Sequence, residues 1–503
     1  MGAGHIDDPS RAFSVLSYGR VSLGFVMAGL LALMAADLGV TVLHPGAELA
    51  RLLAGVVHPD LLAVGARGVA LTVAFAVLGV SGGALAGFAL SLVFHRVRFF
   101  CAAIRSVHEL FWALLLMQVL GPSPAAGLLA IAIPYAGIFA KVFAEMIEEA
   151  DLAADRVLPA GTGTLSRFAY ARAPMLASPI GNYLLYRLEC GLRSTLVLGF
   201  IGLPTMGFEL ESYFRQGHYA QAAGFVLVFY ALIGSRRLWA RVSTLPFLLL
   251  VSVMALVWLA PPVTGGSIWT ALGRFLGHDI VPSPLRTGGA LMPWLWAILR
   301  DQALPGLVNT LVVSQLAMIG MAVIALALFP LTAARFTGRI GRPLGRVLLV
   351  VIRSTPEYMA AYVLLQLLGP SMLPAVIALA VHNGGVLAFL MGRQADDVAL
   401  RADAPRGLDL YCWEVVPRLY GQFLAYVLYR WEIIVRESAI FGILGIRTLG
   451  FHVDAAIQEL HLDVAVVLIV VTGGLSMLID AGSRALRHRL RLSDRPVRLS
   501  ATA

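Results

Sequence analysis

The stretch that decides the fold occurs twice in the chain. It reads YRLECGLRSTLVLGFIG at Tyr186–Gly202 and YRWEIIVRESAIFGILG at Tyr429–Gly445. Both copies place a Tyr-Arg-x-Glu sequence before an Arg, continue with apolar residues and end in spaced glycines. They lie 243 residues apart, since 436 minus 193 is 243. A pattern this specific, found twice, indicates an internal duplication.

The duplication extends toward the N-terminus of each copy. RSVHE at 105–109 recurs as RSTPE at 353–357, and GPS at 121–123 recurs at 369–371, both with an offset of 248. The second copy has therefore lost five residues between these motifs and the Tyr-Arg-x-Glu stretch. We predict two units, residues 1–242 and 243–503.

The composition excludes a soluble protein. Of 503 residues, 59% are hydrophobic and only 13% are charged, with a mean hydropathy of +0.82. Soluble domains carry about 25% charged residues, because their surfaces need them. The chain is predicted to be an integral membrane protein.

Helices of membrane-spanning length are expected throughout. A span needs about 20 apolar residues to cross about 30 Å of hydrocarbon. This criterion gives twelve candidates, several of which are short or interrupted by Gly and Pro, notably the third and the ninth. They lie near 21–43, 68–94, 106–121, 125–147, 177–202, 220–240, 244–262, 304–330, 346–369, 372–392, 421–445 and 462–482. The first lacks a signal-peptide cleavage site and is interpreted as a retained span. We therefore expect an all-α integral membrane fold with about 12 transmembrane helices. Six spans per copy is an even number, so the two pseudo-symmetric halves should be parallel.

The arginines predict the orientation. They concentrate at 96–105, 236–241, 335–353 and 484–498, between every second pair of spans and after the last one. Such runs stay on the cytoplasmic side of a membrane, so the net charge of +9 does not indicate nucleic acid. Both termini are then cytoplasmic.

No catalytic or metal-binding motif is present. The cysteines Cys101, Cys190 and Cys412 have no paired spacing and no His-rich neighbourhood, so no disulfide or metal site is expected. A P-loop needs Gly-x-x-x-x-Gly-Lys-Ser/Thr, but the one lysine, Lys141, follows Ala140 inside a span. We therefore expect a chain that is not an enzyme and does not itself hydrolyse ATP.

Charges inside apolar segments are candidates for a transport path, because they are costly in lipid and usually face an interior. Glu189 precedes Arg193 by four residues, and Glu432 precedes Arg436 by four. Each pair shares a helix face, so it could be a local, self-neutralising ion pair. Alternatively, Arg193 and Arg436 face each other and offer guanidinium groups to a doubly charged oxyanion.

Further candidates flank these pairs. Tyr186 and Tyr429 are possible interface anchors on the same path. Arg105, Glu109, Arg353 and Glu357 are expected at the cytoplasmic end of the third helix of each half. There they would line the exit, pair with a cytoplasmic segment, or form salt bridges.

A polar segment separates the fourth and fifth spans of each half. In the first copy, residues 148–174 predict a helix, a turn at Gly161 and a second helix, although an ordinary solvated loop is an alternative. This hairpin resembles the EAA loop of ATP-binding-cassette importer permeases, whose short coupling helix seats in a cleft of the ATPase subunit. The Tyr-Arg-x-Glu stretches and the RS-x-x-E segments resemble those of phosphonate-type importer permeases. The resemblance covers both halves from about their second spans, and this chain looks like a tandem fusion of two such permeases.

The resemblance implies a type I importer permease fold and a path for phosphonate, phosphate or phosphite. It also implies two partner ATPase subunits, which would bind ATP and Mg, an extracytoplasmic substrate-binding protein, and a location in the bacterial plasma membrane. ATPase coupling would involve Glu149, Ala153, Gly161, Pro174, Asp397, Ala404 and Pro417.

The second half departs from the family pattern. Its loop, residues 392–417, is five residues shorter and has Ala404 where Gly161 stands, although Pro417 aligns with Pro174. We therefore expect two unequal coupling surfaces. An external insertion at 263–303 receives no role.

Two other functional classes, a secondary active transporter and a purely structural membrane protein, fit the sequence less well. A secondary active transporter can also have two parallel six-helix halves. Residues 335–342 faintly resemble a loop of the major facilitator superfamily, but its acidic partner is missing and the strongest repeat lies elsewhere. A purely structural membrane protein would not need to carry costly intramembrane charges twice.

Overall fold

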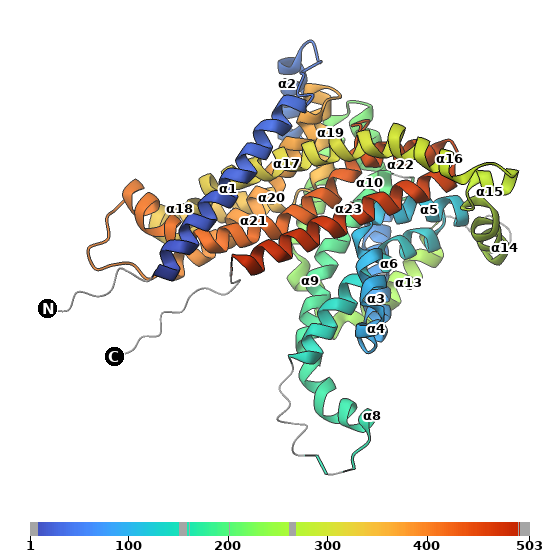
Figure 1. Cartoon of the computed structure of the whole chain (residues 1–503), viewed down its shortest axis with the longest axis horizontal. Helices are drawn as coiled ribbons and strands as arrows, with labels where there is room; N and C mark the ends of the chain where they lie inside the picture. The colour runs from blue at the N-terminus through green and yellow to red at the C-terminus, as the bar shows by residue number, and fades with distance from the viewer. Residues whose placement is uncertain are drawn as a thin grey trace. The chain divides into compact units, whose positions relative to one another are not determined.

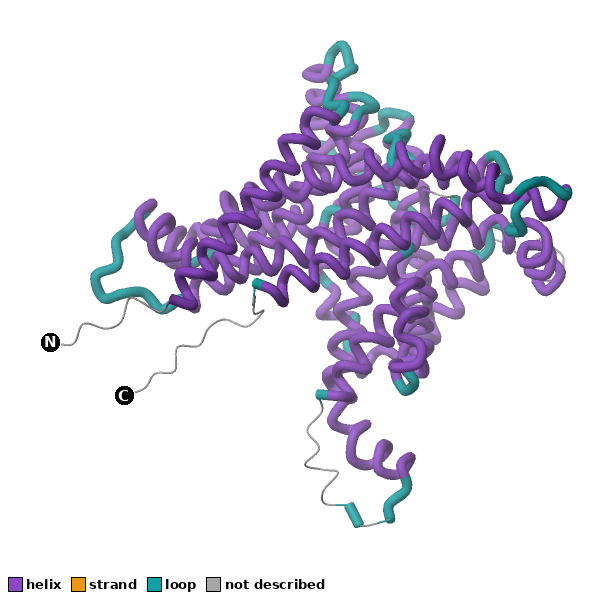
Figure 2. Tube along the Cα trace, viewed as in Figure 1, coloured by secondary structure: helices purple, strands orange, loops and turns teal. Residues whose placement is uncertain are grey.

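The computed structural model describes residues 9–149, 158–159, 161–200, 202–260, 268–490 and 492. Within these ranges the regular elements are helices and no strand is present (Figure 2). The all-α prediction is therefore confirmed. A chain in lipid must satisfy its backbone groups internally, and helices do so within one segment.

Seven of the described helices are long and apolar enough to cross a membrane, or up to nine if each of two bent pairs is one span. Each of the twelve predicted segments falls on helical structure, but α9 (Ala173–Phe200) and α21 (Val416–Ser438) carry several charges, and α11 (Tyr219–Gly234) has only 16 residues. The predicted number of twelve membrane crossings therefore stays a prediction.

The chain folds as two compact units. Unit 1 contains Met1–Pro45, Trp296–His452 and Leu475–Ala503, and unit 2 contains Gly46–Leu295 and Val453–Gly474. The first helix of each sequence repeat therefore packs with later helices of the other repeat. The boundary predicted between residues 242 and 243 separates the two sequence repeats. The compact units have different boundaries, because each unit contains helices that pack together whichever repeat they come from.

Unit 1 contains the following described helices: α1 (Pro9–Ala35), η4 (Leu299–Ala303), α17 (Leu304–Leu328), η5 (Phe329–Thr332), α18 (Ala334–Ser354), α19 (Glu357–Leu368), α20 (Met372–Asp397), η6 (Leu410–Val415), α21 (Val416–Ser438) and η7 (Ala439–Gly442). The unit boundaries divide α16 (Leu291–Ile298), α22 (Leu449–Gln458) and α23 (Leu462–Arg489), and Pro45, the first residue of α2 (Pro45–Val57), belongs to unit 1.

Unit 2 contains the following described helices: α2 (Pro45–Val57), α3 (Ala66–Ser91), α4 (Phe94–Ser106), α5 (Glu109–Leu120), α6 (Pro124–Glu148), α8 (Thr164–Arg167), η1 (Phe168–Arg172), α9 (Ala173–Phe200), α10 (Met206–Arg215), α11 (Tyr219–Gly234), α12 (Arg236–Trp239), η2 (Val242–Thr244), α13 (Leu245–Leu259), α14 (Ile268–Arg274), η3 (Phe275–Asp279) and α15 (Ser283–Thr287).

Helix α1 packs in unit 1 along α17 (Figure 1). Gln315 of α17 donates from Nε2 to the carbonyl oxygen of Phe25 at 2.9 Å. The Phe25 ring meets Trp431 of α21 edge-on, with centroids 5.3 Å apart. These contacts fix the N-terminal helix of the first repeat against the second repeat.

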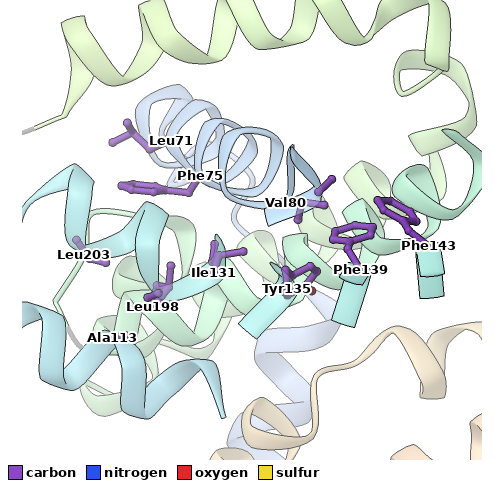
Figure 3. Packing of buried hydrophobic residues seen from close by; sticks show 12 residues of the cluster. Leu71, Phe75, Val80, Ala113, Ile131, Tyr135, Phe139, Phe143, Leu198 and Leu203 are labelled. Carbon is purple, nitrogen blue, oxygen red and sulfur yellow. The ribbon is translucent and has the colours of Figure 1, made fainter. Parts of the chain in front are cut away.

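In unit 2 the counterpart is α13, which packs against α3. Arg67, at the start of α3, donates from Nε to the carbonyl oxygen of Leu259 at the end of α13, at 3.0 Å. Residues of α3 and α6 form the centre of the core, with Phe75, Ile131 and Phe139 fully buried (Figure 3).

Small residues let α3 and α6 approach closely. A Cβ added to Gly83 would lie 2.8 Å from Tyr135 Cβ, and one added to Gly87 would lie 2.9 Å from the carbonyl oxygen of Ala136. Because lipid tails are as apolar as leucine, helices in a membrane associate through such packing. The glycines of α3 thereby position Tyr135.

Each repeat contains a sharply bent helix pair. Helices α4 and α5 meet at 87°, and α18 and α19 meet at 86°. Pro356 explains the second bend, because a proline disfavours the helical conformation of the residue before it. At the first bend the His108 ring accepts a hydrogen bond from the Leu110 backbone N–H at 3.1 Å and caps α5. The predicted span 346–369 is therefore bent, and the predicted span 106–121 begins at the first bend and contains only α5.

Candidate functional site

The repeated glycines close a tight turn after α9 and after α21. Gly202 has φ +95° and Gly445 has φ +84°, backbone conformations that favour glycine. A Cβ added to Gly207 would collide with the carbonyl oxygen of Leu196, and one added to Gly450 with that of Ala439. The spaced glycines of the motif thus bring the next helix, α10 or α22, back against the helix end.

A threonine secures this turn in both repeats. Thr72 of α3 donates to the carbonyl oxygen of Gly68 at 2.8 Å and accepts from the Met206 backbone N–H at 2.9 Å. Thr310 of α17 does the same with Gly306, at 2.7 Å, and with the Leu449 N–H, at 2.9 Å. Sequence reasoning missed these threonines; the signal was a Gly-x-x-x-Thr pattern repeated with an offset of 238, since 310 minus 72 is 238.

Beside the first bend lies a group of polar side chains that we call the first polar cluster, made of Glu109, Tyr135, Arg187 and Ser194. The Arg187 guanidinium carbon is 5.2 Å from the ring centroid of Tyr135. Ser194 donates from Oγ to Glu109 Oε1 at 2.7 Å and is also a neighbour of the Tyr135 hydroxyl. His108 Nε2 lies 3.7 Å from Glu109 Oε2.

The second polar cluster consists of Glu357, Asn383, Arg430 and Glu437. Arg430 donates from Nη1 to Asn383 Oδ1 at 3.0 Å, and Asn383 donates from Nδ2 to Glu437 Oε2 at 3.1 Å. Glu357 is a further neighbour of Glu437, and His382 Nε2 lies 3.8 Å from Glu357 Oε2. One amide thus bridges a cation and an anion.

The two polar clusters occupy matching positions of the repeats. Positions 109 and 135 match 357 and 383 with an offset of 248, and positions 187 and 194 match 430 and 437 with an offset of 243. Tyr135 stands near the middle of α6, and Asn383 near the middle of α20. Since α6 and α20 are apolar helices of spanning length, both clusters lie far from the ends of these spans. Ionisable groups at that depth are functional candidates.

The predicted ion pair of the first repeat has an additional partner. Arg193 Nη2 is 3.9 Å from Glu189 Oε1, while Arg236 Nε is 3.4 Å from Glu189 Oε2. Arg236 also donates to the carbonyl oxygen of Leu185 at 2.9 Å. Glu189 is thus shared between two arginines and does not neutralise both.

In the second repeat Glu432 is buried, with 8% of its surface exposed, and Arg436 lies in the last turn of α21. Arg193 belongs to unit 2 and Arg436 to unit 1, so the hypothesis that they face each other stays a prediction. Tyr186 and Tyr429 are both exposed, as side chains at an interface would be.

The four charged residues of the RS-x-x-E segments lie at the bends. Arg105 and Arg353 are in the last turns of α4 and α18, and Glu109 and Glu357 open α5 and α19. A Cβ added to Gly385, near the middle of α20, would collide with Ile352, next to the second bend. This contact packs the second bend against α20, and the position of the four residues at the cytoplasmic end of the third helix stays a prediction.

The first coupling segment follows α6 and leads into α9. Glu149 caps α6, Gly161 has φ +95°, and Pro174 is in the first turn of α9. Ala153 lies outside the described residues. Helix α8 lies at the far end of α9, beyond α3 and α6 (Figure 1), and Tyr170 in this segment is 80% exposed.

The second coupling segment is tied down by ion pairs. Asp397 ends α20, and the adjacent Asp396 accepts from Arg342 Nη2 and from the Ala334 N–H, each at 2.8 Å. The buried Glu414 contacts Arg401 at 2.8 Å and Arg418 at 2.5 Å.

In the second segment Ala404 closes a turn, since its backbone N–H donates to the carbonyl oxygen of Arg401 at 3.2 Å, but Ala404 is not the left-handed residue. Gly407, three residues later, has φ +65°, and Pro417 again lies in the first turn of the following helix, α21. The shortened loop thus has its left-handed residue at a different position. Asp396, Gly407 and Glu414 were missed by sequence reasoning, which aligned the loops by offset alone.

Part of the external insertion packs in unit 2 against the start of α23. The buried Asp463 accepts from the Ser283 backbone N–H at 2.8 Å and from the Ser283 Oγ at 2.6 Å. Arg286 Nη2 lies 3.6 Å from the same carboxylate oxygen. In the part of the chain that the structure describes, no group of three His, Cys, Asp or Glu side chains could hold a metal ion.

Comparisons with known proteins find sequence similarity to transport permeases. The chain is 25% identical over 432 residues to the phosphate-import permease protein PhnE of Mycolicibacterium smegmatis, covering 80% of this chain and 78% of the relative. It is 30% identical over 175 residues to the phosphite transport system permease protein PtxC of Stutzerimonas stutzeri, covering 35% of this chain and 64% of that protein.

A third relative is the putative phosphite transport system permease protein HtxE of the same organism, 32% identical over 131 residues, covering 26% of this chain and 50% of that protein. No family model and no solved structure matches the chain. The chain is therefore similar to phosphate- and phosphite-import permeases, and the resemblance that its repeated motif indicates is confirmed.

Proposed function

We propose that this chain is the fused transmembrane permease of an ATP-binding-cassette importer and forms the translocation path for a phosphorus oxyanion. The observation that carries the proposal is the extent of the similarity: a match over 80% of the chain must include parts of both repeats. The match to PtxC, 175 residues or 64% of that protein, corresponds to a relative of about 270 residues, since 175 divided by 0.64 is about 273. That is the length of one repeat, as expected for a tandem fusion. The relatives do not favour the secondary transporter.

The charges of the apolar helices support an anionic substrate. Helix α9 carries Arg187 and Arg193 against one acid, Glu189, and that acid is also contacted by Arg236. The first repeat therefore has more guanidinium groups than carboxylates along this helix. Guanidinium groups offer paired N–H donors that match the oxygens of phosphate and phosphonate.

We further propose that ATP and Mg bind to separate ATPase subunits, one at each coupling segment, and that an external binding protein delivers the oxyanion. With both termini cytoplasmic, as the arginine distribution predicts, residues 148–174 and 392–417 face the ATPase side. The permease then contributes no chemistry of its own; it binds, orients and passes the anion as the ATPase closes and opens.

Reconstitution tests this proposal directly. Purified alone in nanodiscs, the chain should hydrolyse no ATP. Assembled in proteoliposomes with its ATPase and its binding protein, it should support ATP-dependent uptake of phosphate, phosphite or methylphosphonate. ATP hydrolysis that tracks the isolated chain, or an assembled complex that carries none of the three anions, would contradict the proposal.

Double substitutions test whether Arg193 and Arg436 receive the anion. If they serve only as partners of Glu189 and Glu432, removing Glu and Arg together should restore both protein level and uptake. If they receive the oxyanion, the doubles should restore protein level but leave uptake low, because the positive charge is still absent. We expect the second result. Because Glu189 also contacts Arg236, Arg193→Ala alone should reduce the protein level less than Arg436→Ala does.

A further inference from the structure

The feature that carries a further inference is Arg187 in the first polar cluster. Its guanidinium carbon lies 5.2 Å from the ring centroid of Tyr135 and 5.8 Å from that of Tyr183. Tyr135 is near the middle of α6, a helix of membrane-spanning length. Arg187 therefore holds a permanent positive charge at an interior depth, where charged side chains are costly.

The surroundings of Arg187 do not neutralise that charge. Among the described residues, its contacts are the two tyrosine rings and Cys190 Sγ at 4.0 Å, and none of them is a carboxylate. Its Nε–H is buried without a hydrogen-bond acceptor. The attraction between a desolvated cation and an aromatic face offsets only part of the desolvation of a guanidinium. Positive charge and at least one donor thus remain available to an anion.

The matching arginine of the second repeat is in a different situation. Arg430 donates to Asn383, and Asn383 donates to the carboxylate of Glu437. At the position of Glu437 the first repeat has Ser194, and at the position of Asn383 it has Tyr135. The second repeat therefore supplies its arginine with a hydrogen-bonded anion from within the protein, and the first repeat does not.

We propose that Arg187 is a substrate-binding residue: its guanidinium receives the phosphorus oxyanion midway across the membrane, while Arg430 is neutralised within the protein and is structural. This inference rests on the proposed function and names one residue of its path. The rings of Tyr135 and Tyr183 hold the guanidinium in place and leave its N–H groups for two oxygens of the anion. Arg193 stands six residues further along α9, about 9 Å away along the axis at 1.5 Å per residue and on a different face of the helix, so the role of Arg187 is proposed independently of Arg193.

The test compares Arg187→Gln with its matched control, Arg430→Gln, in the complete complex with ATPase and binding protein. The probes are inorganic phosphate and phosphite. We expect Arg187→Gln to assemble at the wild-type level and to lose ATP-driven uptake by about ten-fold or more, since hydrogen bonds to charged groups contribute about 1.5–3 kcal/mol. Arg430→Gln should lower the yield of complex but leave uptake per assembled complex within about three-fold.

A lysine variant keeps the proposal testable if Arg187→Gln fails to assemble. Lys at position 187 satisfies the tyrosine rings as a cation but lacks the planar guanidinium fork. Arg187→Lys should therefore assemble and recover only part of the uptake. Full wild-type uptake in Arg187→Lys, or in Arg187→Gln, overturns the role of Arg187.

A binding measurement gives a readout that does not depend on transport. Phosphate should raise the unfolding midpoint of the purified wild-type chain and of Arg430→Gln, because a ligand stabilises the state that binds it, but not that of Arg187→Gln. An equal phosphate-dependent shift in Arg187→Gln and wild type overturns the inference. If the wild-type complex carries neither anion, the proposed function itself fails; if wild type and Arg187→Gln carry them equally, only the assignment of Arg187 fails.

Discussion

The two polar clusters show how two copies of one sequence diverge inside a single chain. In the first cluster a tyrosine and a serine occupy the places that an asparagine and a glutamate occupy in the second. The first thus surrounds its arginine with aromatic rings, and the second connects its arginine to a carboxylate. In a permease made of two identical chains, every change appears on both sides. A fused chain is free of that restriction, so one copy can specialise in the anion while the other stabilises the structure.

The strongest way to break this comparison is to remove the bridge in the second cluster. Asn383→Leu leaves Arg430 and Glu437 buried without their shared partner, and breaking a buried charged network costs about 3–5 kcal/mol. We expect a large drop in the thermal unfolding midpoint of the purified chain. In the first cluster, Tyr135→Phe keeps the ring below Arg187 and should change stability by less than about 1 kcal/mol. Equal effects of the two substitutions would mean that the clusters do not differ in the way described.

The glycine turns should behave alike in both repeats. A Cβ on Gly207 or Gly450 collides with a backbone carbonyl, which no side-chain rotation relieves. Such overpacking typically costs about 1–3 kcal/mol. Gly207→Ala and Gly450→Ala should therefore reduce the amount of folded protein to a similar extent, measured as monodisperse protein after detergent extraction. Gly474→Ala, a substitution into open space, is the control and should leave it unchanged. A strong effect of only one turn substitution would contradict a scaffold shared by the repeats.

More of the fold than of the candidate site could be predicted from the sequence. Apolar length and arginine distribution are local properties of the sequence, so they indicated the helices at the correct places. The sequence marks the third and ninth spans as short or interrupted, but it does not predict the sharp bends near Val107 and Thr355, because the angle between two helices depends on how they pack. The exchange of α1 and α13 between the units depends on long-range packing, which composition does not contain.

The charged positions show the same limit. Spacing within one helix correctly placed Glu189 and Arg193 within reach of each other. It could not reveal that Arg236 shares Glu189 or that Tyr135 lies under Arg187, because these contacts join separate helices. Aligning the repeats column by column would have found that Asn383 replaces Tyr135 and that Glu437 replaces Ser194, and these two exchanges are the sequence signal of unequal clusters.

Substituting the paired threonines tests the shared scaffold more finely. In Thr72→Val the Met206 N–H loses its acceptor, and in Thr310→Val the Leu449 N–H loses its own. A buried unsatisfied donor costs about 1–3 kcal/mol, so each valine should lower the unfolding midpoint by a similar amount. Thr72→Ser and Thr310→Ser keep the hydroxyl and should retain most of the stability. If valine were as stable as threonine, the hydrogen bond would not hold the turn.

The smallest effect on stability is expected at the coupling segments, where the two repeats differ again. Gly161 has φ +95° with open space around it, so a side chain there meets only the backbone penalty of the left-handed region, about 1–2 kcal/mol. Gly161→Val should leave membrane insertion intact and weaken co-purification of the ATPase, because the turn orients α8 and η1.

Gly407→Val should act less strongly, since the ion pairs of Glu414 and Asp396 hold the second segment in place. Ala404→Gly is the matched control: it restores the glycine of the first repeat at the aligned position, but the left-handed residue is Gly407, so this substitution should change nothing. Normal assembly and transport by Gly161→Val would remove the docking role from residues 148–174, and a gain of ATPase binding in Ala404→Gly would place the functional turn at the aligned position.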